Sequence, residues 1–582
     1  MATTYHDIKY AFRKLRRSPG FTAVAVLSLA LGIGANTAIF SMINGILYKS
    51  LPVRNPHELR VINWTGQVLR PFRIEGNVGR INSHRVHGGS FPYPAYRDFA
   101  EQARGFSDVF AFSYFEDPVT ISTGGVASLA SPQTVSGNFF QGYGAQVLIG
   151  RPITPDDDRL GAPPVAVLTY PFWQRVYGLD PNVLGQTLTV RDTGFTVIGV
   201  LPRRYVGPLA GERRTDFYVP MITQPRLFLE REWLDTYDAW WVQIMGRLAP
   251  GANEAQVQTL LEPLFSQILS RSEAEIERPG ILLQEGQHGV LTRRRETAQP
   301  LWHLQGVVGL VLLIACTNLA GLLLARGAAR QHEMAVRAAM GAGRWRLIRQ
   351  SLAESMILSL AGVCLGLVLS QWIRTTVTAF IVDPSGNRDF NLRIDTNVLL
   401  FALAVGTVTA LLSGLFPALR AGNTDPSAGP KDSGTRGAPR LRLGKVLVST
   451  QVGLSVILVV AGGLLCRTLI NLYRTDTGFN TENLLAVPIR SSQSLSPPEA
   501  VKPFFNAVRQ KIAEIPGVRS VALAERALLS GFAHKERVSI PGRPDERPRE
   551  ALEHVVSDGY FATMGINLLQ GRDFRATDTL ES

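Results

Sequence analysis

Cysteine is scarce in this sequence, and charged residues are fewer than in most soluble proteins. Only three cysteines occur among 582 residues, and all of them lie inside long apolar runs: Cys316, Cys364 and Cys466. This placement excludes a disulfide framework and a zinc cluster built from cysteine. Charged residues make up 18% of the chain, whereas soluble domains usually contain about 25%. Hydrophobic residues make up 45%, which argues against intrinsic disorder.

Motifs for nucleotide binding and catalysis are also missing. A phosphate-binding loop requires G-x-x-x-x-G-K-[ST], so that backbone N–H groups surround the phosphates. The nearest approach runs from Gly437 to Lys445, but its spacing is wrong and no hydroxyl residue follows the lysine. No G-x-S-x-G nucleophile motif is present. We therefore expect a non-catalytic protein with no cofactor and no metal site.

What the sequence does contain is long hydrophobic runs. Runs of about 20 apolar residues are long enough to span a bilayer, and five of them occur, at residues 21–48, 304–325, 356–373, 398–419 and 446–472. One such run could be a buried helix of a soluble protein, but five make that interpretation untenable. The first run is longer than the apolar part of a cleaved signal peptide. We predict five transmembrane helices, the first of them an uncleaved anchor.

The net charge of +13 is concentrated beside these runs. Residues 1–20, 326–351 and 420–445 carry +4, +5 and +4, which together equal the whole net charge, while residues 374–396 are neutral. Basic segments next to spans stay in the cytoplasm. The pattern therefore predicts a cytoplasmic N-terminus with a juxtamembrane helix over 1–20, and cytoplasmic segments at 326–351 and 420–445. Residues 49–303 and 473–582 are then extracytoplasmic, and the basic charge indicates a membrane rather than a nucleic acid.

Both extracytoplasmic regions have an α/β pattern. In the first, we predict strands at 163–168, 195–200 and 242–248, and an amphipathic helix at 252–269. In the second, we predict strands at 484–489 and 518–524, with a helix that begins after Ser496.

A long internal repeat links the two regions. Residues 135–140 (VSGNFF) match residues 556–561 (VSDGYF), and further residues match at the same offset of 421: Gly144, Leu148, Gly150, Arg151 and Asp157 with Gly565, Leu569, Gly571, Arg572 and Asp578. Leu47-Tyr48 at the end of the first span likewise matches Leu472-Tyr473. Such a repeat predicts duplication of a unit made of one span and one domain. The second copy ends at a point where the first continues with a strand, so we expect a truncated chain.

The segment 326–355 resembles the inner loop of FtsX/MacB-type ABC-transporter permeases. Those loops share the pattern E-x-A-V-R-x-A-x-G-A-x-R-x-x-[LI]-x-x-Q-x-x-x-E-S, filled here by Glu333, Ala335, Val336, Arg337, Ala339, Gly341, Ala342, Arg344, Leu347, Gln350, Glu354 and Ser355. Residues 7–21 and 32–41 resemble the same family. Together with the duplication, these features look most like the duplicated permeases abundant in Acidobacteria, often called orphan because their ATPase gene is not adjacent.

The resemblance implies an architecture and a set of partners. It implies a MacB-like core domain over 49–303, an FtsX-like permease domain over 304–419 and an incomplete second core domain over 473–582, in a multi-pass protein of the cytoplasmic (inner) membrane. It also implies that the inner loop couples to an ATPase on a separate chain, through Glu333, Ala335, Val336, Arg337, Gly341, Arg344, Gln350 and Glu354. The chain would act as a homo- or heterodimer in the lipid bilayer.

Two functions from different classes fit these features. The first is the permease subunit of an ABC-type efflux or mechanotransmission system, in which ATP hydrolysis on the partner moves the extracytoplasmic domains. The second is a membrane-anchored binding or sensor protein of the cell envelope that works without an ATPase. A membrane enzyme is a weaker third alternative, because no catalytic constellation occurs. The spans lack interior charges that would mark a substrate path, since Arg467, near the end of the fifth run, is the one charged residue in them. This favours moving outer domains over transport through a duct.

Overall fold

The computed structural model describes most of the chain, in two compact units. It describes residues 12, 13, 15–70, 72, 74, 78–81, 85–113, 118–123, 126–209, 214–227, 233–290, 294–329, 344–377, 395–422, 438–487, 489, 501–525, 528, 534–538, 549–575, 577 and 578. The first unit comprises residues 1–119, 129–189 and 193–464, and the second comprises 120–128, 190–192 and 465–582. Each unit is described by itself below.

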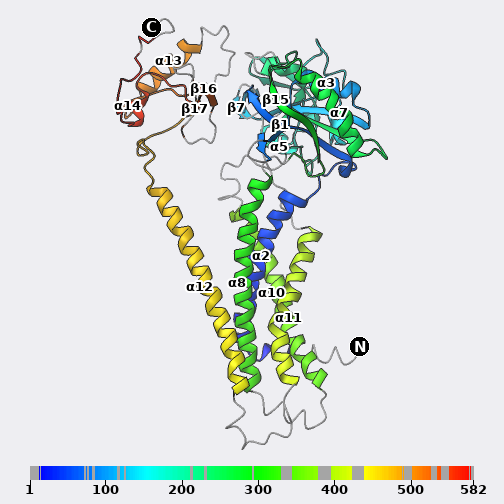
Figure 1. Cartoon of the computed structure of the whole chain (residues 1–582), viewed down its shortest axis with the longest axis vertical. Helices are drawn as coiled ribbons and strands as arrows, with labels where there is room; N and C mark the ends of the chain where they lie inside the picture. Colours follow the sequence, from blue (N-terminus) through cyan, green and yellow to red (C-terminus); the bar gives the residue numbers. More distant parts are fainter. Residues whose placement is uncertain are drawn as a thin grey trace, which may run out of the picture. The chain divides into compact units, whose positions relative to one another are not determined.

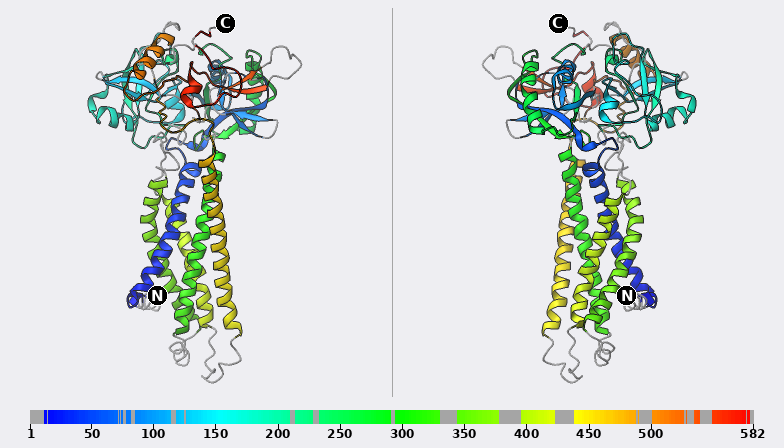
Figure 2. Two further views of the ribbon diagram at one scale, coloured as in Figure 1. Left: turned by 90° about the vertical axis from the view of Figure 1, so that its left-hand side faces the viewer. Right: turned by 90° about the vertical axis from the view of Figure 1, so that its right-hand side faces the viewer.

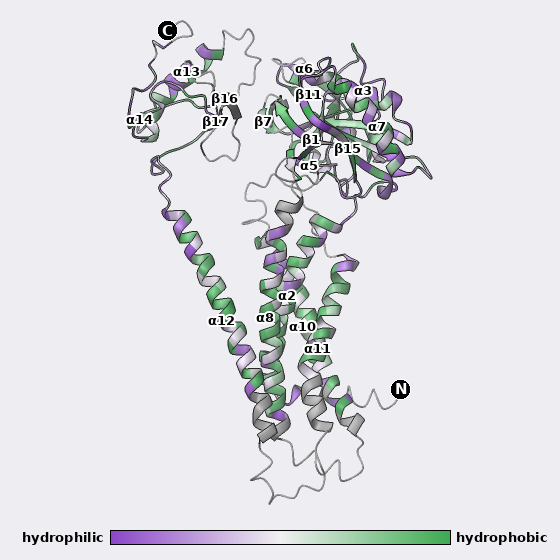
Figure 3. Cartoon of the chain, viewed as in Figure 1, coloured by the Kyte–Doolittle hydropathy of each residue, from purple (hydrophilic) through white to green (hydrophobic). Residues whose placement is uncertain are grey.

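Long apolar helices form a bundle in the first unit. They are α2 (Pro19–Ile43), α8 (Arg294–Ala329), α10 (Arg344–Val377) and α11 (Thr396–Gly422). α2 packs against α8, α10 and α11, and α11 packs against α8 and α10; the views agree that the four helices run side by side (Figures 1 and 2). Their surfaces are largely apolar (Figure 3), as expected of helices that face lipid.

A fifth long helix, α12 (Ala438–Arg474), follows the bundle in sequence. Five described helices, including α12, are long and apolar enough to cross a membrane. They coincide with the five apolar runs of the sequence. No side chain in the apolar window of α12 is buried, in contrast to α2, where more than half of that window is buried.

A mixed α/β domain occupies residues 59–285 of the first unit. β1 (Leu59–Arg70) pairs antiparallel with both β14 (Val242–Leu248) and β15 (Glu275–Glu285), and β14 pairs with β5 (Phe106–Ser113). β5 leads through β8 (Pro132–Val135) and β13 (Phe217–Pro220) to β10 (Val165–Leu168) and β12 (Thr193–Val200). The β13–β8 and β10–β12 pairs are parallel, so this sheet is mixed.

Two aromatic cores hold this domain together. One lies under α3 (Tyr93–Gln102) and α7 (Glu254–Leu269), where Trp64, Trp240 and Phe265 are fully or almost fully buried. The other lies under the short helix α4 (Phe139–Tyr143), where Phe139 and Tyr143 stack on each other. α7 starts at Asn253, whose side chain caps the backbone N–H groups of Ala255 and Gln256.

The predicted elements of this domain are confirmed, with small changes of boundary. β10, β12 and β14 correspond to the strands expected at 163–168, 195–200 and 242–248, and α7 corresponds to the helix expected at 252–269. α7 and much of β12 bury one face, whereas every residue of β10 and β14 is buried.

The second unit contains α13 (Val501–Ala513), the hairpin of β16 (His534–Val538) and β17 (Arg549–Glu553), and α14 (Tyr560–Met564). α13 corresponds to the helix predicted after Ser496. The strand predicted at 484–489 is wrong for its described residues, since 484–487 and 489 contain no strand. The strand predicted at 518–524 is reduced to a single bridge between Ala524 and Val556. An apolar run becomes a strand only where a neighbouring strand takes up its hydrogen bonds.

α4 and α14 have closely similar surroundings. Before α4, the Ser136 Oγ accepts a hydrogen bond from the Ala111 N–H at 2.9 Å, and the Ser136 N–H donates to the Ala111 carbonyl at 2.9 Å. Before α14, Ser557 makes the same two bonds with Leu523, also at 2.9 Å. Each helix ends at a glycine in the left-handed conformation, with φ of 80° at Gly144 and 67° at Gly565.

A bidentate ion pair follows each of these helices. Arg151 donates to both carboxylate oxygens of Asp157, at 2.6 and 2.8 Å. Arg572 donates to both carboxylate oxygens of Asp578, at 2.7 and 2.9 Å. The repeated sequence therefore adopts the same local structure in both units.

Candidate functional site: the helix bundle and its two ends

In sequence, the predicted ATPase-coupling residues follow α8, which ends at Ala329, and run into α10, which begins at Arg344. Glu333, Ala335, Val336, Arg337 and Gly341 lie outside the described residues. Of the rest, Arg344 is the first residue of α10, Gln350 is half-buried, and the Glu354 side chain is buried at 8% exposure. α10 thus begins inside the predicted coupling segment and continues without a break into the bundle.

The N-terminal segment packs against this same end. Leu15 is buried at 4% exposure in a cluster with Leu319 and Leu323 of α8 and Leu358 of α10. The guanidinium of Arg326 lies 3.7 Å from the centroid of the Phe21 ring, a cation–π contact between α8 and α2. The end of the bundle that carries the predicted coupling segment is therefore built from α2, α8 and α10 together.

Close contacts between small residues hold the middle of the bundle. A Cβ atom built on Gly34 of α2 would lie 2.9 Å from the carbonyl oxygen of Gly366 of α10. One on Gly362 would lie 2.8 Å from the Leu29 Cβ, and one on Gly32 would lie 2.9 Å from Leu312 of α8. Small residues spaced four apart allow membrane helices to approach this closely. At Gly34, where the nearest atom is backbone, α2 has no room for a side chain.

A buried amide joins α2 to α8 next to these glycines. The Asn36 side-chain N–H donates to the carbonyls of Gly32 and Val308, both at 2.8 Å. The Gln305 amide of α8 in turn donates to the Asn36 Oδ1 at 2.8 Å. Polar pairs in an apolar bundle fix one helix against another, because separation would leave their donors and acceptors unsatisfied.

The other end of the bundle joins the α/β domain through a neck formed by residues 44–53 and 286–290. α2 ends in a π-helical turn, η1 (Asn44–Tyr48), and the Asn44 side chain donates to the Asp395 carboxylate at 2.9 Å, just before α11. Beyond it, the Leu51 N–H donates to the Gln287 carbonyl at 2.8 Å. His288 Nδ1 lies 3.1 Å from the Lys49 carbonyl oxygen. Hydrogen bonds therefore join the two segments of the neck, one entering and one leaving the α/β domain.

The entry segment is also tied to the α/β domain by a buried arginine. The Arg247 side chain of β14, 2% exposed, donates to the carbonyls of Asn55, Gly142 and Tyr143 at 2.9 to 3.2 Å. It also donates to the Glu58 carboxylate at 2.9 Å, and this hydrogen bond lowers the pKa of Glu58. A single charged side chain thus joins the entry loop, α4 and the central sheet.

The bundle provides a packed connection, along α2, from the Leu15 cluster to the neck. Among the residues that the structure describes, no three His, Cys, Asp or Glu side chains are grouped as metal ligands would be. The sequence analysis assigned no contact to Asn36, Asn44, Phe21 or Leu15; the only signal for the first two was an asparagine within an apolar run.

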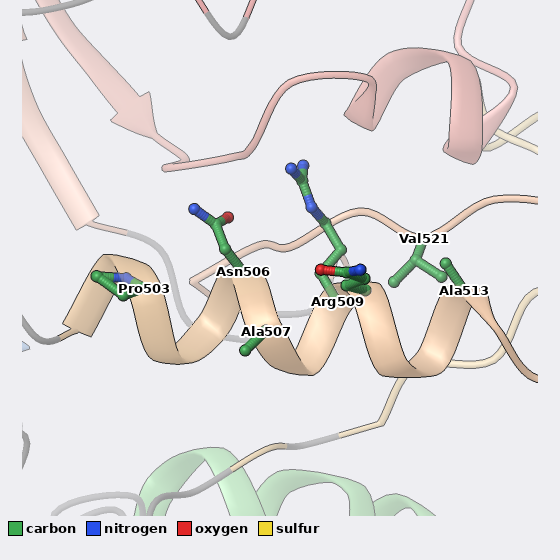
Figure 4. A pocket seen from close by; sticks show the side chains of 7 residues that line it. Pro503, Asn506, Ala507, Arg509, Ala513 and Val521 are labelled. Atoms are coloured by element: carbon green, nitrogen blue, oxygen red, sulfur yellow. The ribbon is translucent and has the colours of Figure 1, made fainter.

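The second unit contains a pocket on one side of α13. The Asn506 and Arg509 side chains point away from the helix on that side (Figure 4). Arg509 is not a free cation, because it donates to the Asp558 carboxylate at 2.6 Å. The pocket is lined by Pro503, Asn506, Ala507, Arg509, Gln510, Ala513 and Val521.

Two protein-family models match the chain. Residues 22–264 match the model described as MacB-like periplasmic core domain. Residues 306–426 match the model described as FtsX-like permease C-terminal. The first match covers most of α2, residues 44–53 of the neck and most of the α/β domain, and the second covers most of α8 and all of α10. The second also covers α11.

Curated relatives match over about half of this chain. The chain is 25% identical over 273 residues to the pyoverdine export ATP-binding/permease protein PvdT of Pseudomonas syringae pv. tomato, covering 47% of this chain and 38% of that protein. It is 25% identical over 299 residues to the macrolide export ATP-binding/permease protein MacB of Escherichia coli (strain K12), covering 51% of this chain and 42% of that protein. The chain therefore matches well under half of the length of either relative.

Solved structures that match this chain have lower sequence identity to it than the curated relatives. The periplasmic region of MacB from Actinobacillus actinomycetemcomitans matches at 14% identity, covering 45% of this chain and 98% of that one, with a TM-score of 0.28. The extracellular domain of the noncanonic ABC-type transporter YknZ from Gram-positive bacteria matches at 13% identity, with a TM-score of 0.26. The match covers 38% of this chain and 99% of that one.

Proposed function

We propose that this chain, a MacB/FtsX-like permease by its two matched domains, is the membrane subunit of an ABC-type efflux or mechanotransmission system. In this proposal, ATP hydrolysis on a separate ATPase moves the coupling segment 326–351, and the bundle passes that movement to the α/β domain. The observation that carries the proposal is the continuous packing along α2, from the Leu15 cluster beside the coupling segment to the neck.

We propose that the ATPase is a separate chain. PvdT and MacB are described as ATP-binding/permease proteins, and both are described as exporters. The sequence contains no G-x-x-x-x-G-K-[ST] loop, and in this proposal a partner supplies it. The coupling residues proposed to meet this partner are Glu333, Ala335, Val336, Arg337, Gly341, Arg344, Gln350 and Glu354.

The proposed orientation places the coupling segment in the cytoplasm and the α/β domain outside. The positive charge beside the apolar helices supports this orientation, as does the match to a model described as a periplasmic core domain. The protein is then a multi-pass protein of the cytoplasmic membrane with a cytoplasmic N-terminus, acting as a homo- or heterodimer.

We also propose that the second unit is a copy of the first domain and its preceding span. The matched hydrogen bonds of Ser136 and Ser557 support this, as do the matched ion pairs Arg151–Asp157 and Arg572–Asp578. The same local structure at one constant sequence offset is hard to account for without a duplicated unit. In this proposal, the chain is one of the duplicated permeases of the MacB/FtsX type.

Reversing one charge in the coupling segment tests the ATPase partnership. In full-length chain purified from its native membranes, Arg337→Glu is expected to lower the amount of co-purifying ATPase at least about ten-fold, since replacing one partner of an interfacial charge pair typically costs 2 kcal/mol or more. The ATPase is measured by ATP hydrolysis in the eluate and by peptides that contain the phosphate-binding loop.

The matched control is Arg278→Glu, because the Arg278 side chain is 89% exposed in the α/β domain. It is expected to leave co-purification unchanged. Equal ATPase recovery from both variants and the wild type would overturn the coupling assignment. Recovery of no ATPase from any of them would favour the binding or sensor function.

Labelling of single cysteines tests the orientation. In a variant without the three native cysteines, Leu160→Cys lies on the α/β domain at a side chain that is 92% exposed, and Ser427→Cys lies in the segment 420–445. A membrane-impermeant maleimide is expected to label Cys at 160 in intact cells, and Cys at 427 only after the cytoplasmic membrane is opened. The reverse pattern would contradict the charge-based topology.

A further inference from the structure

The exit of α2 differs from the exit of α12, although the two are proposed copies. α2 changes into the π-helical turn η1 at Asn44, and the Lys49 N–H donates to the Asn44 carbonyl at 2.9 Å, five residues back. α12 continues as an α-helix to Arg474. Aligning Tyr48 with Tyr473 places Leu469 at the position of Asn44. The asparagine and the π-helical turn thus occur together in one copy and are both absent from the described exit of the other.

A π-helical turn of this kind is a rare element. Its hydrogen bonds span five residues, and such turns are frequent at functional sites. The Asn44 N–H is shared between the carbonyls of Phe40 and Ser41, which marks the point where the α-helical pattern fails. Gly45 follows and has low helix propensity. Local sequence therefore allows this turn to change conformation at small cost.

The turn is held from outside by a charged partner. The Asn44 side chain is buried at 3% exposure, and it donates to the Asp395 Oδ2 at 2.9 Å. The other oxygen of the same carboxylate accepts from the Val398 N–H at 3.1 Å, at the start of α11. A carboxylate is stabilised at the N-terminus of a helix. α11 therefore holds Asp395 in place, and Asp395 in turn holds the Asn44 side chain. Hydrogen bonds to a charged acceptor are about twice as strong as neutral ones.

We propose that η1 is a hinge between α2 and the α/β domain, and that the Asn44–Asp395 hydrogen bond is the latch that holds it in the π-helical form. Asn44 and Asp395 are positioning residues, and they act through the backbone of residues 44–49. This inference rests on the proposed function, in which movement of the bundle must reach the α/β domain. Opening of the latch frees the chain where α2 passes into the π-helical turn, at the start of the neck.

A charge exchange between the two positions tests the latch in the full chain in lipid nanodiscs. Asn44→Asp sets two carboxylates against each other, and amide hydrogen exchange over residues 45–50 is expected to accelerate roughly ten-fold or more, the loss expected of a hydrogen bond to a charged group. Adding Asp395→Asn restores an amide–carboxylate pair with the roles reversed. The double variant is expected to return to within about two-fold of the wild type, as coupled residues do.

The matched control is Asn471→Leu, which removes an exposed asparagine from the exit of α12. It is expected to leave exchange over 45–50 unchanged. A general loss of structure would accelerate exchange throughout the bundle and would not be rescued by the second substitution. Spin labels at Leu31 of α2 and Leu160 of the α/β domain, both exposed, are expected to show a broader distance distribution in Asn44→Asp and the wild-type distribution in the double variant.

Two results would overturn the hinge: unchanged exchange over residues 45–50 in Asn44→Asp, or no rescue in the double variant. Neither measurement needs the ATPase, so the hinge and the proposed function can fail separately. If the ATPase is captured but the exchange is unaltered, the hinge is wrong and the function stands. If the exchange is rescued but no ATPase is captured, the hinge stands and the coupling to ATP hydrolysis is wrong.

Discussion

Gly34→Leu is expected to separate α2 from α10 and to destabilise the whole bundle. A Cβ at this position would lie 2.9 Å from the Gly366 carbonyl oxygen and 3.4 Å from the Leu369 Cβ. The nearest obstacle is backbone, which cannot rotate away as the end of a flexible side chain can. Overpacking of a well-packed interior costs about 1–3 kcal/mol, and we expect the upper end of that range or more, because three further carbon atoms follow the Cβ.

The matched control for this prediction is Gly463→Leu in α12, because nothing lies within 4 Å of a Cβ built on Gly463. It makes the same change of residue in a helix of similar apolar character, and its effect is expected to stay within about 0.5 kcal/mol. Unfolding of the purified full chain in mixed micelles, followed by far-ultraviolet circular dichroism, measures both. Equal effects of the two substitutions would mean that α2 and α10 do not approach each other at Gly34.

The positions of the helices followed from their composition, but their contacts did not. The apolar runs at 21–48 and 304–325 predicted α2 and α8, because 20 apolar residues form a helix in lipid regardless of their neighbours. The Asn36–Val308 hydrogen bond joins residues 272 apart in sequence. Which face of α2 meets α8 depends on how four helices pack together. The contacts between helices cannot be read from the order of residues in one sequence.

Strands were predicted well only where a partner strand exists. The run at 242–248 became β14, which pairs with β1, β5 and the short strand β4 (Ser90–Phe91). The run at 484–489 is also apolar, but its described residues form no strand. The π-helical turn at Asn44–Tyr48 was not foreseen either, and Asp395, which binds its Asn44 side chain, lies 351 residues away in the sequence.

Arg247→Met is expected to destabilise the α/β domain of the first unit by about 3 kcal/mol, because a buried carbonyl left without its donor costs about 1–3 kcal/mol, and the Glu58 carboxylate, which is 25% exposed, adds a smaller part. Methionine fills much of the same volume, so the loss comes from unpaired groups rather than from a cavity. The substitution would remove the hydrogen bonds that Arg247 donates to the carbonyls of Asn55, Gly142 and Tyr143. It would also remove the bond to the Glu58 carboxylate. Fluorescence of the buried Trp64 and Trp240 during denaturant unfolding of the full chain measures the effect.

The stability difference between the wild type and Arg247→Met is expected to depend on pH, and this dependence identifies the electrostatic part of the difference. The hydrogen bond from Arg247 lowers the pKa of Glu58 in the folded chain, so its contribution is fully present above the unfolded pKa of about 4.3 and is lost as the pH falls through the lower, folded value. The stability difference between the wild type and Arg247→Met is therefore expected to shrink on acidification below about pH 4. Arg278→Met, at a side chain 89% exposed, is the control and should match the wild type at every pH. A difference that stays constant down to pH 2 would assign the whole effect to the three carbonyls, and the Glu58 pair would then contribute nothing.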